Sequence, residues 1–282
     1  MTNKDTQIEK ADQFRKLHHS GKMLVLPNIW DALGAILLES LGYRAVATAS
    51  AAVAWANGYN DGENIPFDDL LATLKKITSL VNIPVTADIE SGYADNDIQL
   101  RENIKRLIEA GIVGINIEDT DKKSRNIHTI EAQCNKIRLI KKVADEVGIP
   151  VFINARTDGF LHGELFATPV AQFEEIVKRG LAYKEAGADC FFPIALKQKE
   201  DIEQLVTLLK MPINIITIPG VPDLKILSKA GVARVSLGPS FLKIAVKAMK
   251  NIAVQLQDYD GLSAITGNEI TSDYLKELIN KK

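Results

Sequence analysis

The sequence predicts a (β/α)8 barrel, in which eight parallel strands form a ring inside a layer of helices. Short apolar runs alternate with longer segments of helical periodicity, which is typical of repeated βα units. The residues that precede the runs alternate between glycine and proline, and both residue types mark helix ends. A length of 282 residues suits one such barrel, and no low-complexity linker divides the chain. We therefore expect a single domain over residues 1–282.

Eight apolar runs are the predicted strands. In chain order they cover residues 23–28, 45–50, 83–90, 114–119, 149–157, 189–195, 213–219 and 233–239. Strands two, four, six and eight follow a glycine, as in AGIVGINIED, whereas strands three, five and seven follow a proline, as in NIPVTADIE. Residues 23–240 would thus form the barrel.

Two segments lie outside the predicted barrel. Residues 1–22 contain a helical pattern, over residues 5–20, that we expect to cover the barrel's N-terminal end. Residues 241–282 form further helices, with a break at Asp260 and Gly261. A tail longer than barrel closure requires often packs on a neighbouring subunit, so we expect a homo-oligomer, either a dimer or a tetramer.

The composition excludes several classes of protein. The chain is 46% hydrophobic and 25% charged, as in ordinary globular domains. Its net charge of −2 argues against a nucleic-acid or anionic-membrane partner. Cys134 and Cys190 lack metal-ligand spacing, and we expect both to be reduced. The first residues are too polar for a signal peptide and no apolar run is long enough to cross a membrane, so we expect a cytoplasmic protein.

Acidic residues end two of the predicted strands. Asp88 and Glu90 lie in IPVTADIESGY, and Glu118 and Asp119 lie in GINIEDT. Barrel active sites occur at the C-terminal ends of the strands. Carboxylate oxygens gathered there suit Mg²⁺, and Asp61 in NGYNDGEN is a further candidate. The alternative is that these acids only cap the helices that follow them.

The first two strand ends offer a candidate substrate pocket. Trp30, after strand one, would form its floor or belong to the core. Ser50 and Ala51, in ATASAAVAW, are small enough for a ligand to approach their backbone N–H groups, which suit a carboxylate. The alternative for these small residues is tight packing of a helix on the sheet.

Strands five and seven add polar candidates. Arg156, in FINARTDG, carries a forked cation suited to a carboxylate or an oxyanion. Asp158 could instead pair with Arg156, which would make both residues structural. Asn214 lies on strand seven.

The four histidines and the lysines give weaker indications of function. His18 and His19 belong to the N-terminal helix, and we expect both to be solvated. His128 and His162 follow strands four and five in loops that overhang the rim, as proton shuttles or as plain polar surface. No predicted strand contains a lysine, which disfavours Schiff-base chemistry.

The chain resembles the isocitrate lyase/phosphoenolpyruvate mutase superfamily over residues 14–249. The resemblance rests on these stretches taken in order: PNIWDALGA, ATASAAVAWANGYNDGE, PVTADIESGY, GINIEDT, INARTDGF, GADCFFP and GVARVSLGP. It implies a Mg²⁺ enzyme, with Mn²⁺ as an alternative, that acts on small 2-oxo acids or their enolates. The same resemblance implies tetramers whose C-terminal helices pack on a neighbouring barrel.

The resemblance also implies roles for individual residues. It places the metal ion on Asp88, Glu90 and Glu118, partly through water, with Asp61 nearby. The catalytic residues are then Arg156, Glu118 and Asp61. Substrate contacts are expected from Trp30, Ser50, Ala51, Asp61, Arg156 and Asn214.

The loop after strand four departs from the superfamily. Members that cleave isocitrate or methylisocitrate carry Lys-(Lys/Arg)-Cys-Gly-His there, whereas this loop reads EDTDKKSRNIHTIEAQC. Ser124 lies near the expected cysteine, and a serine is a much poorer proton donor near neutral pH. We therefore do not expect isocitrate-type cleavage.

Phosphoenolpyruvate mutases resemble Glu-Asp-Lys-x-x-Pro-Lys-x-Asn in this loop. The chain keeps Asn126 at the matching distance but lacks the Pro-Lys step. Lys122, Lys123 or Arg125 could replace that lysine by moving with the loop. Residues 121–133 would then close over the site and exclude water.

The leading functional interpretation is a lyase or decarboxylase that acts on an oxaloacetate-like acid. The small-molecule substrate would be a 2-oxo acid or a phosphonate, whose C–C or P–C bond is cleaved or rearranged through an enolate. One alternative is a phosphoenolpyruvate mutase or a phosphonopyruvate hydrolase. The other is a barrel that binds a small carboxylic acid without turnover.

Overall fold

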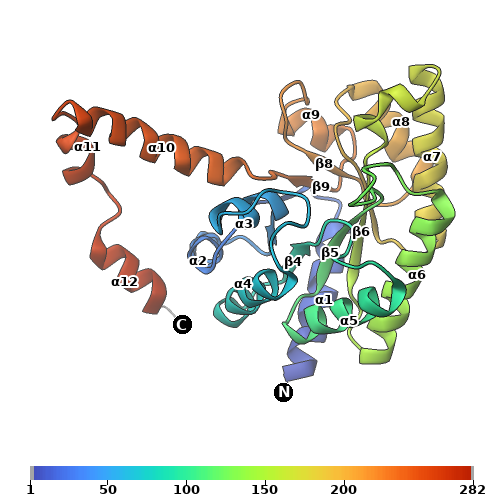
Figure 1. Cartoon of the computed structure of the whole chain (residues 1–282), viewed down its shortest axis with the longest axis horizontal. Helices are drawn as coiled ribbons and strands as arrows, with labels where there is room; N and C mark the ends of the chain where they lie inside the picture. Colours follow the sequence, from blue (N-terminus) through green and yellow to red (C-terminus); the bar gives the residue numbers. More distant parts are fainter. Residues whose placement is uncertain (1–2, 281–282) are drawn as a thin grey trace.

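Nine short parallel strands form the centre of the molecule in the computed structural model, which describes residues 3–280 (Figure 1). They are β1 (Leu24–Leu26), β2 (Asn28–Ile29), β3 (Val46–Thr48), β4 (Val85–Asp88), β5 (Gly114–Glu118), β6 (Phe152–Thr157), β7 (Cys190–Pro193), β8 (Asn214–Ile216) and β9 (Arg234–Ser236). Each lies within a predicted run or overlaps it. β1 and β2 correspond to one predicted strand, interrupted at Pro27, which has no N–H to donate to a ladder.

The strands follow one another around a ring. Six of them pair in the order β2-β3-β4-β5-β6-β7, and the other three pair in the order β1-β9-β8. A parallel bridge between Phe191 and Ile213 connects β7 to β8, and Pro27 connects β1 to β2. The predicted barrel architecture is confirmed.

Helices surround the ring (Figure 1). They are α2 (Ala32–Ser40), α3 (Ser50–Ala56), α4 (Phe67–Leu80), α5 (Asp97–Glu109), α6 (Ile130–Val147), α7 (Pro169–Glu185), α8 (Lys199–Leu209) and α9 (Leu224–Lys229). Side chains that accept from backbone N–H groups begin several of them, including Asp31 at α2, Asn96 at α5 and Thr129 at α6. Gly148 ends α6 with a left-handed φ of 75°.

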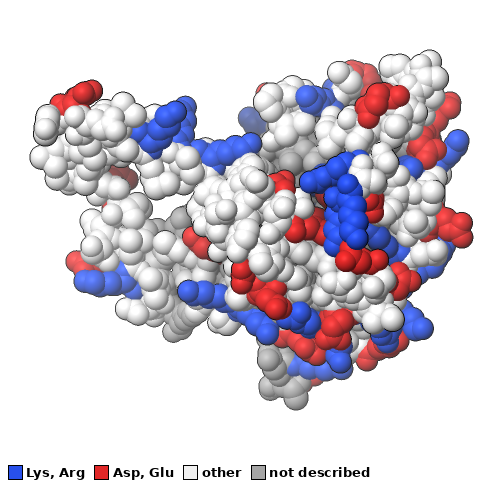
Figure 2. Space-filling view, viewed as in Figure 1, with Lys and Arg blue, Asp and Glu red and all other residues white. Residues whose placement is uncertain are grey.

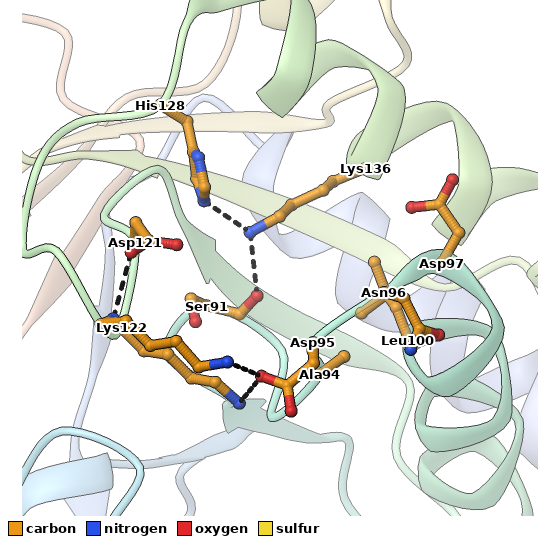
Figure 3. A pocket seen from close by; sticks show the side chains of 11 residues that line it. Ser91, Ala94, Asp95, Asn96, Asp97, Leu100, Asp121, Lys122, His128 and Lys136 are labelled. Carbon is orange, nitrogen blue, oxygen red and sulfur yellow. Dashed lines mark hydrogen bonds and ion pairs between the residues drawn. The ribbon is translucent and has the colours of Figure 1, made fainter.

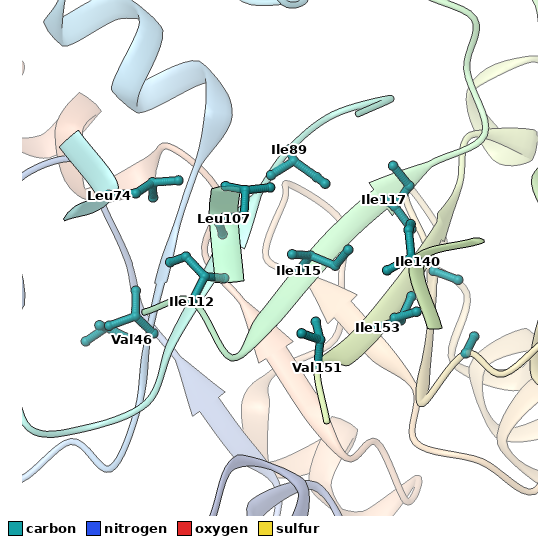
Figure 4. Close-up of a cluster of buried hydrophobic side chains, with 14 of the residues drawn as sticks. Val46, Leu74, Ile89, Leu107, Ile112, Ile115, Ile117, Ile140, Val151 and Ile153 are labelled. Atoms are coloured by element: carbon teal, nitrogen blue, oxygen red, sulfur yellow. The ribbon is translucent and has the colours of Figure 1, made fainter. Parts of the chain in front are cut away.

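The main core lies between the ring and the helices (Figure 4). Ile115 and Ile117 of β5 are buried in this layer with Ile140 of α6. The alternate residues of β5, Asn116 and Glu118, therefore point to the interior of the ring. This alternation brings the polar groups of neighbouring strands together inside the barrel.

Helix α1 (Asn3–His18) closes the N-terminal end of the barrel, as predicted. Its Phe14 is fully buried and meets Phe152 edge-on, with ring centroids 5.2 Å apart. His18 stacks on the same Phe152 ring at 4.1 Å and is 4% exposed, so the expectation of a solvated His18 was wrong. Burial, helped by the charge of Arg234, lowers the pKa of His18 to about 3, so it is neutral at physiological pH.

A polar layer fills the middle of the barrel. The Arg234 guanidinium donates to Asn116 Oδ1 at 3.3 Å, and the Asn154 amide donates to the same oxygen at 2.8 Å. Asn214 is fully buried in this interior and pairs in register with Arg234. Burial lowers the pKa of Arg234 to about 10, which still leaves it charged near neutrality.

The C-terminal helices leave the barrel and return. α10 (Ser240–Gln257) projects from the ring and buries none of its residues, and α11 (Leu262–Thr266) follows it (Figure 1). α12 (Ser272–Asn280) comes back to contact α2, where Leu278 is buried. Among residues 3–280, no helix is both long enough and apolar enough to span a membrane.

Candidate active site

A cavity of about 310 Å³ opens at the C-terminal ends of the strands. Asp61, Glu90, Glu118 and Arg156, all expected at the site, line it together with Ser50. They come from four different βα loops or strand ends, so the ring itself brings them together. A larger hollow of about 590 Å³, near α2, α4 and α12, is mainly apolar.

Asp88 and Glu90 are fixed by local hydrogen bonds. Asp88 Oδ2 accepts from the Ser50 hydroxyl at 2.9 Å and from the Ser50 N–H at 3.3 Å. Glu90 is 5% exposed and has a left-handed φ of 50°, and its Oε1 accepts from the Tyr93 hydroxyl at 3.0 Å. The Ser50 N–H, which we expected to bind substrate, thus donates to Asp88, which we expected to bind the metal ion.

The carboxyls of the cavity have raised pKa values. Burial raises the pKa of Glu90 to about 7 and raises that of Glu118 well above its usual range. Burial and the like charge of Asp88 raise the pKa of Asp61. A group of carboxyls in this condition gains free energy by holding a proton or a cation.

Arg156 is the main cation facing these acids. Its Nη1 lies 2.8 Å from Glu118 Oε2, while Nε and Nη2 contact the two oxygens of Asp158 at 2.6 and 3.1 Å. Burial lowers the pKa of Arg156, but the charges of Glu118 and Asp158 outweigh burial and raise it. Arg156 therefore does pair with Asp158, as the alternative predicted, and it also lines the cavity.

Asp119 points away from the cavity. It is fully buried and accepts from the Tyr183 hydroxyl at 2.7 Å and from Arg179 Nη1 at 3.2 Å. Successive strand side chains face opposite sides, so Asp119 faces α7 when Glu118 faces the ring interior. Its position at the strand end made it a candidate, but its contacts are structural.

The loop after β5 is a tight, ordered turn. Thr120 and Ile127 form an antiparallel bridge, and Asp121 Oδ1 accepts from the N–H of Ser124 at 2.7 Å. α6 begins at Ile130, so the loop is shorter than the predicted 121–133 segment.

The basic residues of this loop point in different directions. Lys122 and Lys123 both contact Asp95, each at 3.1 Å, outside the cavity. Arg125 lines the cavity, and its guanidinium covers Gly62 so closely that a Cβ there would overlap Nη2. Within residues 3–280, the Arg125 side chain makes no ion pair. Ser124 and Asn126 are exposed on the turn.

Three predicted substrate contacts lie elsewhere. Trp30 lines the larger hollow beside α2, because the chain turns outward after β2. Asn214 is in the polar layer below the carboxylates, and Ala51 is buried within α3. Neither Ala51 nor Asn214 lines the cavity.

Other residues at the cavity were not selected from the sequence. Thr120 donates to Asp158 Oδ2 at 2.6 Å, and Leu161 lines the opening beside His162. The glycine-containing turn ESGY after a strand-end acid was a usable signal for Tyr93, which contacts Glu90. Leu161 offered no comparable signal.

The site fits Mg²⁺ better than a metal held entirely by protein. No three Asp, Glu, His or Cys side chains within residues 3–280 converge closely enough to form a metal cage. Mg²⁺ does not need one, because it keeps several waters and binds through one or two carboxylates. Asp88, Glu90 and Glu118 offer carboxylate oxygens that match that requirement. The pKa values of Glu90 and Glu118 are raised, and Asp88 accepts a hydrogen bond from Ser50.

The comparisons decide the family. A family model for phosphoenolpyruvate phosphomutase matches residues 14–257 of the chain. The chain belongs to the phosphoenolpyruvate phosphomutase family. Its similar proteins include lyases and mutases, so the resemblance deduced from the motifs is confirmed.

Three proteins illustrate the relationship. An uncharacterised protein of Mycobacterium tuberculosis is 32% identical over 225 residues, covering 80% of this chain and 81% of that protein. A 2-methylisocitrate lyase of Halalkalibacterium halodurans is 26% identical over 264 residues, covering 90% and 84%. An oxaloacetate decarboxylase of Pseudomonas putida is 25% identical over 271 residues, covering 93% and 90%.

Solved structures share the whole fold. A Burkholderia cenocepacia protein, provisionally described as a lyase/mutase, is 29% identical, has a TM-score of 0.88 and covers 98% of this chain and 97% of its own. A phosphonopyruvate hydrolase, solved with oxalate and Mg²⁺, has a TM-score of 0.83 at 22% identity and covers 96% and 95%. The latter likeness concerns the fold alone.

Charges of both signs are interspersed on the face shown in Figure 2. Lys and Arg side chains lie next to Asp and Glu side chains there, and no broad basic field is visible on that face.

Proposed function

We propose that the chain is a Mg²⁺-dependent lyase that cleaves a carbon–carbon bond of an oxaloacetate-like 2-oxo acid through an enolate. The observation that supports it best is a set of carboxyls, of which Glu90 and Glu118 are buried, that shares one small cavity with the Arg156 guanidinium. The raised pKa values of Asp61, Glu90 and Glu118 mean that a cation bound beside these carboxyls would stabilise their ionised forms.

Asp88, Glu90 and Glu118 would hold the metal ion, partly through water, and Asp61 would lie beside it. Glu90, Glu118 and Asp61 line the cavity. Asp88 does not line it, but it accepts hydrogen bonds from Ser50, which does. When bound, Mg²⁺ supplies positive charge where negative charge develops on the keto oxygen as the bond breaks. Mn²⁺, which accepts the same oxygen ligands, would replace it.

Arg156 would bind the reacting end of the substrate. Its three contacts with Glu118 and Asp158 fix the guanidinium plane toward the cavity. A substrate carboxylate would take the place of Glu118 at Nη1, and Glu118 would then be free for the metal side. After this exchange the substrate carboxylate would contact Nη1 and Asp158 would still contact Nε and Nη2, so the buried guanidinium would remain paired.

Arg125 favours a substrate with a second acidic group. It faces the same cavity and makes no ion pair among the described residues, although its charge acts to lower the pKa of Asp61, while Lys122 and Lys123 are engaged by Asp95. An oxaloacetate-like acid carries two carboxylates, one for each arginine. The absence of Cys-Gly-His from the loop argues against methylisocitrate, although a 2-methylisocitrate lyase is among the relatives.

A phosphonate substrate is the second candidate. The matching family model is that of a phosphomutase, and a phosphonate would satisfy Arg125 as well as a carboxylate does. This reaction breaks a P–C bond through the same enolate. Phosphorus NMR of the products separates it from the lyase reaction.

We also propose that α10 mediates a homo-oligomer, either a dimer or a tetramer. Its residues 245, 248, 249, 252 and 256 form an apolar stripe at helical spacing, yet no residue of α10 is fully buried within its own chain. Met249 is 62% exposed and Leu256 is 44% exposed. An unpartnered apolar helix face of this length is typical of a subunit contact.

The experiment is an assay of pyruvate release from oxaloacetate, methylisocitrate and phosphonopyruvate, first with Mg²⁺ and then with EDTA. Turnover of oxaloacetate that EDTA abolishes would support the proposal. Turnover of phosphonopyruvate alone would replace it with the second candidate. No pyruvate from any of the three and no new product in the phosphorus NMR spectrum, with Mg²⁺ still bound, would mean that the substrate lies outside this set or that the barrel only binds an acid.

A further inference from the structure

Glu63 is a buried carboxylate in a loop that the proposed chemistry does not use. It lies between α3 and α4, and its side chain is only 4% exposed. Oε1 accepts three hydrogen bonds from the loop after β4: from the Ser91 N–H at 3.0 Å, the Ser91 hydroxyl at 2.6 Å and the Tyr93 N–H at 2.9 Å. One oxygen thus anchors the whole turn.

That turn has a strained backbone. Glu90, Gly92 and Tyr93 have left-handed φ values of 50°, 113° and 54°, which are unfavourable for residues with a Cβ. Such conformations persist only where the surroundings hold them in place. The three bonds to Glu63 provide this restraint, and the turn positions the Glu90 carboxylate together with the Tyr93 hydroxyl that contacts it.

The second oxygen of Glu63 faces a different loop. Oε2 lies 3.4 Å from Lys122 Nζ. Figure 3 shows the contact of the same ammonium with Asp95 Oδ1, at 3.1 Å. Lys122 belongs to the loop after β5, which also brings Arg125 to the cavity. Glu63 therefore contacts the turn that carries a metal ligand and the loop that carries a substrate contact.

We propose that Glu63 is a positioning residue that couples the loop after β5 to the metal side of the site, an inference that rests on the proposed function. With Lys122 docked, the buried charge of Glu63 is compensated and its other oxygen restrains residues 90–93. When Lys122 leaves, that charge is buried without its cation, which favours release of the turn. By linkage, metal binding at Glu90 then favours the docked loop to the same extent.

The test compares four variants of the full chain: Glu63→Ala, Glu63→Gln, Lys122→Met and Lys123→Met. Lys123→Met is the matched control, because Lys123 contacts Asp95 but not Glu63. Hydrogen exchange of the segments 90–96 and 119–129 is measured without and with Mg²⁺. Calorimetry with Mg²⁺ alone gives the dissociation constant.

We expect Lys122→Met to speed exchange in both segments and to weaken Mg²⁺ binding by about fivefold or more. Glu63→Ala should do at least as much, and Glu63→Gln should free segment 119–129 while its amide oxygen still protects segment 90–96. Lys123→Met should leave segment 90–96 and the Mg²⁺ affinity unchanged.

Faster exchange confined to segment 119–129 in Lys122→Met, with unchanged Mg²⁺ affinity, would overturn the coupling. So would unchanged exchange in Glu63→Ala. If the wild-type chain binds no Mg²⁺, the proposed function fails, whereas the exchange of segment 90–96 in Lys122→Met still decides whether the loops are coupled.

Discussion

Arg156 and Glu118 are direct neighbours across β6 and β5, and their side chains form an ion pair of 2.8 Å at the rim of the cavity. The register of the two strands, rather than a flexible loop, sets this pair. Asp158 holds the other side of the guanidinium. Three of the five N–H groups of Arg156 are thus engaged by carboxylates, and under the proposed function a substrate carboxylate would displace Glu118 from Nη1.

Arg156→Lys should lower kcat/KM by about 100-fold or more, because a point charge cannot hold Asp158 and the substrate carboxylate on two sides as the guanidinium fork does. Steady-state kinetics with the preferred 2-oxo acid measures this. Arg101→Lys, at the exposed pair with Glu146, is the control and should retain the wild-type rate. Near-wild-type kinetics for Arg156→Lys would exclude a forked contact with substrate.

Asp88→Ala should abolish Mg²⁺-dependent turnover and leave the melting temperature within a few degrees of wild type. Asp88 is only partly buried, and its removal leaves the Ser50 hydroxyl able to bond to water. Activity and calorimetric Mg²⁺ titration measure the effect, with the exposed Asp97→Ala as the control. Retained turnover would remove Asp88 from the metal site.

The stability of the metal-free protein should fall as pH rises from about 5 to about 7.5. Glu90 has its pKa raised to about 7, so the folded state binds more protons than the unfolded state in this window. Because the unfolded chain holds fewer protons, unfolding becomes easier as pH increases. Thermal melts in EDTA would show the trend, and Glu90→Gln should make it shallower.

Added Mg²⁺ should reverse that pH trend, since the ionised carboxyls then face a cation. An equal pH slope in Glu90→Gln and wild type would show that Glu90 is not the group responsible. Glu118 and Asp61, whose pKa values are also raised, shift stability in the same direction, so the slope should not disappear entirely.

Gly114→Ala should destabilise the protein by about 1–3 kcal/mol through overpacking. A Cβ at Gly114 would lie 2.7 Å from Phe14 Cε1 and 2.9 Å from Thr86 Oγ1. Urea denaturation measures the change in the free energy of unfolding. Gly163→Ala is the control, because the nearest atom to its Cβ, in Gln172, is 3.8 Å away. Equal stabilities of the two variants would show that α1 is not tightly seated.

Met249→Glu should shift the protein toward smaller species in sedimentation velocity. The substitution places a charge on the exposed apolar stripe of α10, where a partner subunit would have to desolvate it. Lys247→Glu changes the charge of the same helix on its polar side and should not alter the oligomeric state. A wild-type protein that sediments as a monomer would contradict the proposed contact.

The architecture was accessible from the sequence because it rests on local signals. Apolar periodicity and the alternating glycine and proline stops located all the strands, with the ring order following from the βα repeat. The predicted runs extend beyond several observed strands because apolar residues continue into buried loop starts. His18 was misjudged since its burial depends on Phe152, which is far away in the sequence.

The candidate site was predictable only in part. Strand-end position predicted Glu90, Glu118 and Arg156, which line one cavity, and Asp88, which contacts Ser50 of the lining without lining the cavity itself. Period two would have separated Asp119 from Glu118. The directions of Lys122 and Arg125 depend on the turn conformation of their loop and on Asp95, neither of which leaves a sequence pattern. The function of Glu63 likewise depends on contacts between loops.

Because α1 closes one end of the barrel, it restricts the route by which small molecules reach the interior. With Phe14 and His18 against Phe152, the interior is sealed below the polar layer, so the carboxylates are reached from the opposite rim. Under the proposed function, ion, substrate and product would then enter and leave through the same opening. We expect an ordered sequence in which the ion enters before the acid and the product departs before the ion exchanges. A chelator should consequently inactivate the occupied enzyme more slowly than the empty one.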